Sequence, residues 1–237
     1  MWPRFEPRGQ VAPLMRYATP LLAVALTLVS GVILFAALGF DPLRALHAYF
    51  IKPLSSDYGL AELAVKATPL TLIGVGLALG FRANVWNIGA EGQLAVGAIC
   101  GGGLGLAFYN VQVWWLLPAM FVAAALGGVA WAAIPALLRT KFNANEILTS
   151  LMLSYVALLF LSYLMHGPWR DPQGLNFPES RTFHAAAQLP NLLAGTRLHA
   201  GALIALVVAA AGWLLLTRGF VGFQIRVVGQ APGAARF

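Results

Sequence analysis

Side chains able to bind a polar solute gather in one short stretch, residues 84–93, with the sequence NVWNIGAEGQ. Asn84, Asn87 and Gln93 each offer amide donors and an acceptor, which suit hydrogen bonds to a neutral solute, and Glu91 adds a charge. The stretch lies between two apolar segments. A carboxylate costs about 2.5 to 3.5 kcal/mol at the centre of a membrane helix, which indicates a functional or strongly paired group. We therefore expect these four residues to line a substrate pathway.

Glu91 has three possible roles in this stretch. It could contact solute, pair with an arginine such as Arg82 or one on a partner chain, or cap backbone N–H groups where a helix unwinds. A neutral solute gives no special use for a charge in a low-dielectric site, so we favour the two structural roles. Asn87 and Gln93 are then the better candidates for solute contact.

The elements around this stretch are those of a membrane protein. Of the 237 residues, 59% are hydrophobic and 10% are charged, whereas about a quarter of the residues in a soluble domain carry charge. The mean hydropathy is +0.76. The 15 Lys and Arg are scattered singly, which excludes a nucleic-acid-binding surface. Cys100 has no second cysteine to pair with, and no metal site or cofactor is expected.

We predict an all-α, polytopic membrane helix bundle with about six spanning segments. A span needs about 20 mostly apolar residues, which places them at 19–40, 63–81, 86–108, 113–138, 147–165 and 199–217. The third begins with the polar stretch and is expected to be broken or re-entrant, which is tolerated where protein or a watery cavity covers it. With a cytoplasmic N-terminus, nine Lys and Arg fall inside and six outside, so the positive-inside rule favours that orientation.

The domain prediction follows from these spans. Residues 1–18 form a cytoplasmic segment, 19–217 the transmembrane domain and 218–237 a cytoplasmic segment. Glycines recur every four residues in two spans, which lets helix backbones approach closely in lipid. We predict helix packing there at Gly76, Gly80, Gly97, Gly101 and Gly105; for the first two, the general abundance of glycine in membrane helices is an equal explanation.

Three loops could meet partners or neighbouring helices. The outer loop, residues 166–198, contains four prolines and is expected to form a cap or a short surface helix, either as a docking surface or as a simple cover. In the inner loop, Asn145 is predicted to cap the following helix, with Glu146 beside it. In residues 218–237, Gly219, Gly222 and Gly229 are expected to form turns before a short helix that begins at Pro232. That helix could enter a partner's cleft, or the arginines could anchor the segment at lipid headgroups.

Three blocks of sequence resemble one family. GFRANVWNIGAEGQLAVGA, NANEILTSLMLSYVALLFLSYLMHGPWRDP and GFQIRVVGQAPGAARF are similar to the permease subunits of bacterial ATP-binding-cassette importers of the nucleoside and simple-sugar class, related to ribose and branched-chain amino acid permeases. The blocks occur in the family's order from about residue 60 onward. Members of the family continue with further spans, so we expect the chain, which stops at Phe237, to be truncated.

The resemblance implies the partners and the site residues of such an importer. These are cytoplasmic ATPase subunits, a second permease that is identical or paralogous, and an extracytoplasmic solute-binding protein, at the bacterial cytoplasmic membrane. Asn87, Glu91 and Gln93 fall in its intramembrane motif, and its ATPase-coupling region contains Gly222, Arg226, Gly229, Gly233, Ala234, Ala235 and Arg236.

The function expected from these features is ATP-driven import of a nucleoside, a purine or a simple sugar. The chain itself is not expected to be an enzyme, because the sequence contains no GxxxxGK[ST] phosphate-binding loop. The alternative is an ion- or proton-coupled secondary transporter in which Glu91 titrates, since such transporters also use broken helices. A non-transporting scaffold is disfavoured, because it gives no use for a polar stretch inside a membrane.

Overall fold

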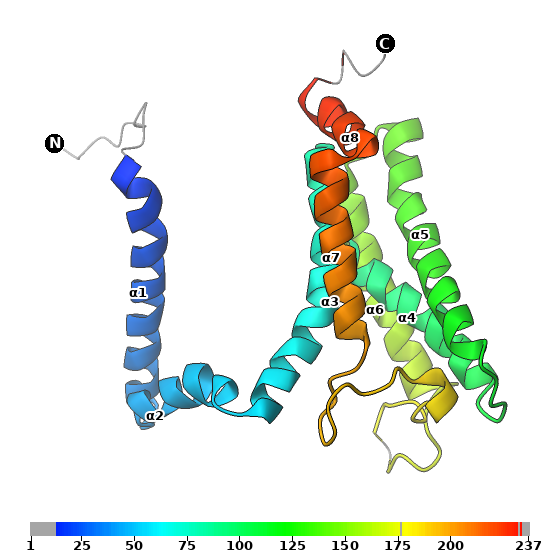
Figure 1. Ribbon diagram of the computed structural model, residues 1–237, viewed down its shortest axis with the longest axis horizontal. Helices are drawn as coiled ribbons and strands as arrows, with labels where there is room; N and C mark the ends of the chain where they lie inside the picture. The colour runs from blue at the N-terminus through cyan, green and yellow to red at the C-terminus, as the bar shows by residue number, and fades with distance from the viewer. Residues whose placement is uncertain (1–12, 176, 232, 234–237) are drawn as a thin grey trace. The chain divides into compact units, whose positions relative to one another are not determined.

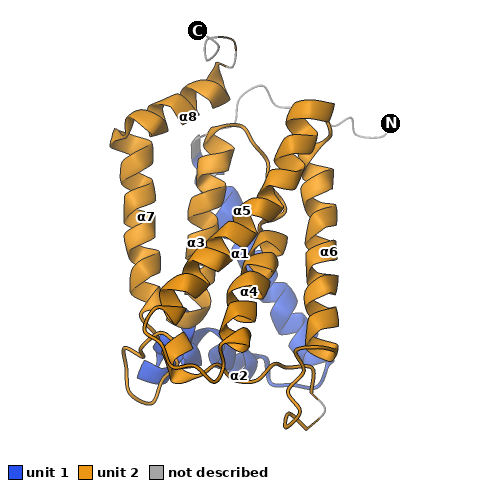
Figure 2. Cartoon of the chain, turned by 90° about the vertical axis from the view of Figure 1, so that its right-hand side faces the viewer, with its two compact units in different colours: residues 1–63 blue, residues 64–237 orange. Residues whose placement is uncertain are grey.

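The chain divides into two units, residues 1–63 and residues 64–237 (Figure 2). A computed structural model describes residues 13–175, 177–231 and 233. Within those residues the regular structure is helical, apart from two isolated β-bridges. The predicted all-α fold is therefore confirmed. Each unit has its own internal packing, and the site described below lies wholly within the second.

The first unit contains α1 (Pro13–Ala37), α2 (Pro42–Leu46) and two irregular turns (Figure 1). α1 stops before the predicted end at residue 40 because Gly39 adopts a left-handed backbone with φ of 78°, and Phe40 N–H bonds back to Phe35 O at 2.9 Å. Asp41 caps α2 through bonds from two backbone N–H groups. A π-helical turn (His47–Ile51) and a 3-10 turn (Lys52–Leu54) follow, and neither turn was predicted.

Six described α-helices follow, and all of them except α8 correspond to predicted spans. They are α3 (Asp57–Arg82), α4 (Ala90–Ala107), α5 (Leu116–Phe142), α6 (Glu146–His166), α7 (Gly201–Arg218) and α8 (Phe220–Gln230). Among the described helices, five are long and apolar enough to cross a membrane: α1, α3, α5, α6 and α7. α3 begins earlier than the predicted residue 63, because the Ser56 hydroxyl accepts a bond from Gly59 N–H and starts the helix.

The third predicted span, 86–108, is broken, as expected. Residues 83–89 are not helical, and α4 begins only at Ala90. α4 then runs obliquely between its neighbours, in contact with both α5 and α6 (Figures 1 and 2). These three helices form the most closely packed part of the second unit.

Glycines bring α4 and α5 into backbone contact. A Cβ added at Gly97 would lie 3.0 Å from Ala124 O, and one at Gly101 would lie 2.9 Å from Met120 O. From the other side, a Cβ at Gly127 of α5 would lie 2.9 Å from the Cβ of Cys100. Close approach of small residues is how membrane helices gain van der Waals contact.

A second set of small residues joins α4 to α6. A Cβ at Gly92 would lie 2.6 Å from the Cα of Ser154, and one at Gly89 would lie 2.8 Å from the Cβ of Ser150. Both serines are buried, with 5% and 2% of their surface exposed. α4 is therefore held on two faces by residues too small to be enlarged without moving a helix.

α8 corrects the prediction for residues 219–229. Gly219 precedes the helix, but Gly222 and Gly229 lie within it rather than in turns. A Cβ at Gly222 would meet the backbone of Leu215 and Leu216 in α7, and one at Gly229 would meet the backbone of Arg82 at the end of α3. These glycines permit tertiary contact, which local sequence does not distinguish from a turn.

The outer loop covers the ends of α4 and α5 within the second unit. It contains one 3-10 turn (Ala185–Ala187), which His184 caps through Nδ1. The Nε2 atom of His184 lies 2.9 Å from the side-chain amide of Gln112, in the α4–α5 connection. Phe183 packs beside Gly102 and Gly105. Of the two forms expected for this loop, the described residues show a cap with one 3-10 turn rather than a longer surface helix.

Candidate functional site

The broken segment, residues 83–89, is held in a defined shape by its own side chains. Asn84 takes a left-handed backbone with φ of 57°, a conformation that asparagine tolerates better than most residues. Its Oδ1 accepts a bond of 3.2 Å from Trp86 Nε1. The Trp86 ring also lies beside Phe81, with 5.0 Å between the ring centroids. The orientation of the Trp86 indole is therefore fixed by two contacts.

Asn87 makes the bonds that begin α4. Its Oδ1 accepts from the backbone N–H of Gly89 at 2.9 Å, and its Nδ2 donates to Gln93 Oε1 at 3.2 Å. The two predicted solute contacts are thus bonded to each other, half-buried, across the start of the helix. The bonded pair leaves the Gln93 amide nitrogen with both N–H donors.

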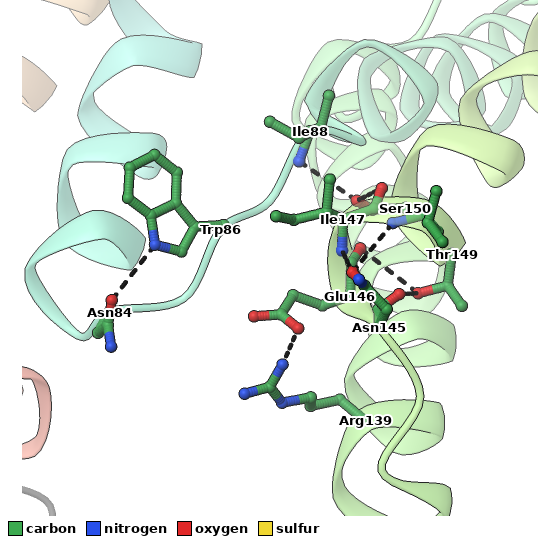
Figure 3. Close-up of polar contacts among 10 residues, drawn as sticks. Asn84, Trp86, Ile88, Arg139, Asn145, Glu146, Ile147, Thr149 and Ser150 are labelled. Carbon is green, nitrogen blue, oxygen red and sulfur yellow. Dashed lines mark hydrogen bonds and ion pairs between the residues drawn. The ribbon is translucent and has the colours of Figure 1, made fainter.

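Ser150 of α6 anchors the same segment from across the bundle. Its hydroxyl accepts a bond of 3.2 Å from Ile88 N–H and donates to Ile147 O (Figure 3). A buried backbone N–H without such a partner would cost about 1 to 3 kcal/mol. Ser150 was not among the predicted site residues, although its place in the stripe Ser150, Ser154, Ala157 on one face of a helix marks it as core-facing.

The α5–α6 loop brings an ion pair to the same place. Asn143 ends α5 with a left-handed backbone, and Asn145 caps α6 by accepting from Ile147 and Leu148 N–H, which confirms the predicted cap. Arg139 Nη1 then pairs with Glu146 Oε2. The Arg139 side chain is 51% exposed and that of Glu146 is 14% exposed. Glu146 projects from α6 toward the broken segment (Figure 3).

These groups line one cavity of about 330 Å³ between α3, the broken segment, α4, α5 and α6. Its polar lining comprises Asn87, Gln93, Arg139, Thr140, Glu146 and Ser150. Leu77, Trp86, Ala132 and Pro135 supply apolar walls. Cavities that bind small molecules range from about 300 to 1,000 Å³ and combine apolar walls with a few polar groups. The cavity is therefore suited to one small polar molecule.

Glu91 does not hold the break in shape. It lies exposed in the first turn of α4, and among the described residues it has no hydrogen bond or ion pair. Asn87 bonds the N–H of Gly89, the residue before α4, and no side chain caps the helix itself. Among the described residues Glu91 therefore makes neither the cap bond nor the ion pair with Arg82 that we expected of it within the chain.

The predicted glycine contacts divide into two groups. Gly97 and Gly101 face α5, and Gly105 faces the Met120 side chain and Phe183. A Cβ at Gly76 would meet nothing within 4 Å, and one at Gly80 only Val85 O at 3.3 Å. Within the described residues, the Gly76 and Gly80 pair therefore makes no contact with another helix.

The described residues of the predicted coupling region hold α8 against its neighbouring helices. Gly222 is buried against α7, and Arg226 Nη1 donates to Leu216 O. Gly229 contacts the end of α3, and Gly233 has open space around it. Ala234, Ala235 and Arg236, together with Pro232, lie outside the described residues.

Comparison with known proteins gives a consistent result. The family described as branched-chain amino acid transport system, permease component, matches residues 59–237. The glucose ABC transporter permease protein of Haloferax volcanii is 40% identical over 98% of this chain and 63% of its own length. The guanosine ABC transporter permease protein of Bacillus subtilis is 29% identical over 96% of this chain and 65% of its own length.

A nucleoside ABC transporter permease protein of Lactococcus lactis is 24% identical over 92% of this chain and 62% of its own length. The chain therefore spans somewhat less than two thirds of the length of these curated relatives. No solved structure matches it. The matched region, residues 59–237, contains the broken segment and the whole cavity.

Proposed function

The chain belongs to the permease-component family of branched-chain amino acid transport systems, and from that membership we propose that it is a membrane-spanning subunit of an ATP-driven importer for a small polar solute. The observation that carries the proposal is a cavity with apolar walls and a few polar groups at the break in a multi-pass bundle. Broken helices at such a cavity are where transporters expose backbone and side chains to solute. Relatives named for glucose, guanosine and nucleosides favour a solute with hydroxyl or ring N–H groups.

Asn87 and Gln93 are the proposed contacts for that solute. Their mutual hydrogen bond fixes the orientation of both side-chain amides at the cavity. Less side-chain entropy is then lost when a solute binds. Asn84 acts through Trp86, whose ring it orients. The solute would occupy the cavity transiently, as α3, α5 and α6 tilt during alternating access.

The proposed partners are those of an ATP-driven importer. Cytoplasmic ATPase subunits hydrolyse ATP and move the permease through α8 and the residues after it, and a solute-binding protein delivers the solute on the opposite side. α8 is suited to transmit such motion because it is seated on both α7 and α3. We further propose that the N-terminus and α8 face the cytoplasm, as the Lys and Arg distribution favours.

Glu91 is proposed to contact a second permease subunit. An exposed carboxylate on an apolar helix needs a partner in a membrane, and within this chain the described residues offer none. Glu91→Gln should weaken association of the two permeases in cross-linking experiments. Normal association with abolished uptake would instead assign Glu91 to solute handling.

The experiment that tests the proposed function is energy-dependent uptake. Cells that express the chain with its partner subunits are given tritiated guanosine, glucose or leucine. Uptake of one probe should collapse on ATP depletion and persist when an ionophore dissipates ion gradients. Collapse with the ion gradient at normal ATP would favour the secondary transporter instead.

A further inference from the structure

Trp86 and the Arg139–Glu146 ion pair face the same cavity as the proposed amide contacts, but from other walls. Trp86 lies on the broken segment, with its indole on the side of Asn84, and Glu146 lies at the start of α6 (Figure 3). We propose that they form a ring-binding subsite, in which the indole face stacks on the solute ring and the ion pair binds its polar edge. This inference rests on the proposed function and deepens it.

Trp86 has the features of a stacking surface. Its one polar atom, Nε1, is already bonded to Asn84, so its contact with solute is through the ring. Phe81 lies beside the ring on the α3 side. The side chain is nevertheless 49% exposed within the chain. A fixed, half-exposed aromatic face binds a flat base or the C–H face of a sugar with little loss of side-chain entropy.

The ion pair supplies complementary hydrogen-bonding groups. A guanidinium has five N–H donors and a carboxylate has about four acceptor sites. Among the described residues, the one hydrogen bond of the Arg139 side chain goes to Glu146, so both groups keep capacity for a ligand. Such a pair can donate to and accept from adjacent hydroxyl groups, or the edge of a nucleobase.

Charge narrows the class of ligand. Arg139 and Glu146 neutralise each other, so the cavity lining carries no net charge. A charged solute would have to break the pair or enter a low-dielectric space uncompensated. The volume of about 330 Å³ is at the lower end for small-molecule sites. The ligand class is therefore a neutral solute of one or two rings that bears hydroxyl or N–H groups.

The alternative role for the ion pair is a clamp on the α5–α6 hairpin alone. Arg139 and Glu146 are only seven residues apart and flank the capped turn. A clamp would depend on the two charges being opposite, not on which position carries which. Exchanging the charges separates the two roles, because a solute contact depends on position.

The test measures solute in the cavity without requiring transport. Ala136 lines the cavity, so Ala136→Cys, in a Cys100→Ala background, reports occupancy through its rate of maleimide labelling. The assembled importer is labelled in membranes with saturating guanosine, glucose or leucine and without ATP. We expect guanosine or glucose to slow labelling, and leucine to have no effect. Protection by leucine alone, or by none of the three probes, would overturn the subsite.

Substitutions then test whether Trp86 and the ion pair each contribute to the protection of the Ala136→Cys thiol from labelling. Trp86→Leu should weaken the protecting probe's apparent affinity about 2- to 12-fold, the range for loss of an aromatic contact, and Trp86→Phe should preserve most of it. The matched control is Trp114→Leu, since Trp114 is 88% exposed and does not line the cavity. Equal behaviour of Trp86→Leu and Trp114→Leu would remove the stacking role.

For the ion pair, Arg139→Gln and Glu146→Gln should each weaken protection at least about tenfold. The exchanged double variant, Arg139→Glu with Glu146→Arg, should regain thermal stability but not protection. Full recovery of protection would leave only a hairpin clamp. Arg44→Gln, which removes an exposed pair with Asp41, is the control for loss of a surface charge. Protection without ATP-dependent uptake would refute the proposed function while keeping the subsite.

Discussion

Replacement of Gly92 by alanine tests the packing that positions the site. A Cβ there would lie 2.6 Å from Ser154 Cα, 3.0 Å from Ser154 Oγ and 3.2 Å from Ser154 N. Carbon atoms in contact normally lie about 3.5 to 4.0 Å apart. α4 and α6 must therefore separate by roughly 1 Å, because the nearest atoms belong to backbone and cannot rotate away.

The expected loss follows from two opposing terms. Overpacking of this kind costs about 1 to 3 kcal/mol, and replacing a helical glycine by alanine returns about 0.5 to 1 kcal/mol. We expect Gly92→Ala to lower the unfolding free energy by about 1 to 2 kcal/mol in a detergent-denaturation titration. The broken segment should loosen with it, because Ser150 anchors Ile88 from the same face of α6.

The control is Gly76→Ala, which introduces the same methyl group into a helix where a Cβ meets nothing within 4 Å. It should leave stability unchanged or raise it by up to about 1 kcal/mol. Equal or greater stability of Gly92→Ala relative to Gly76→Ala would refute the reasoning that α4 and α6 are in backbone contact.

Three further predictions concern the elements around the cavity. Ser150→Ala should speed hydrogen exchange at Ile88 N–H at least about fivefold, since the bond to that N–H is worth about 1 kcal/mol or more. Ser162→Ala, on the exposed face of α6, should leave that exchange unchanged, and equal exchange in both variants would contradict the anchor. Asn145→Ala should destabilise the protein by about 1 kcal/mol in thermal unfolding, and Asn145→Asp by much less, because aspartate also caps helices. Equal losses of stability in the two variants would exclude the helix cap. Gly229→Val should displace α8 from α3 and reduce ATP-dependent uptake, while ATPase recruitment persists. Gly233→Val should leave α8 in place, because Gly233 has open space around it. Normal uptake in Gly229→Val would show that the contact between α8 and α3 has no part in coupling.

Much of the helical architecture could be predicted because it depends on local composition. Runs of apolar residues fix α3, α5, α6 and α7 to within a few residues at most ends, and the polar decapeptide fixes the break before Ala90. Caps are equally local: Asn145 lies directly before an apolar run and bonds the N–H groups expected of it.

Features that depend on contacts distant in sequence could not be predicted. Gly222 and Gly229 were expected in turns, because a glycine that admits another backbone has the same local signature as one that turns the chain. Their true neighbours are in α7 and at the end of α3. Similarly, Ser150 bonds a residue 62 positions away, which only the folded bundle reveals.

The structural role expected of Glu91 could not be judged from the sequence for a different reason. Glu91 was expected to hold the break because a neutral solute gives no use for a charge, yet the bond found at the break comes from Asn87, two residues before Gly89. An Asx turn depends on a short side chain close to the N–H that it caps, not on charge. The ion pair of Arg139 and Glu146 was missed because it depends on the left-handed turn at Asn143.

The central claim is that the cavity at the break lies on the pathway of an ATP-driven importer. Its most direct test is maleimide labelling of Ala136→Cys, in the Cys100→Ala background, from the cytoplasmic side of membrane vesicles. Labelling should change severalfold between the nucleotide-free importer and the importer trapped with ATP and vanadate, because alternating access opens and closes the cavity. Equal labelling in both states would show that the cavity does not lie on the transport pathway.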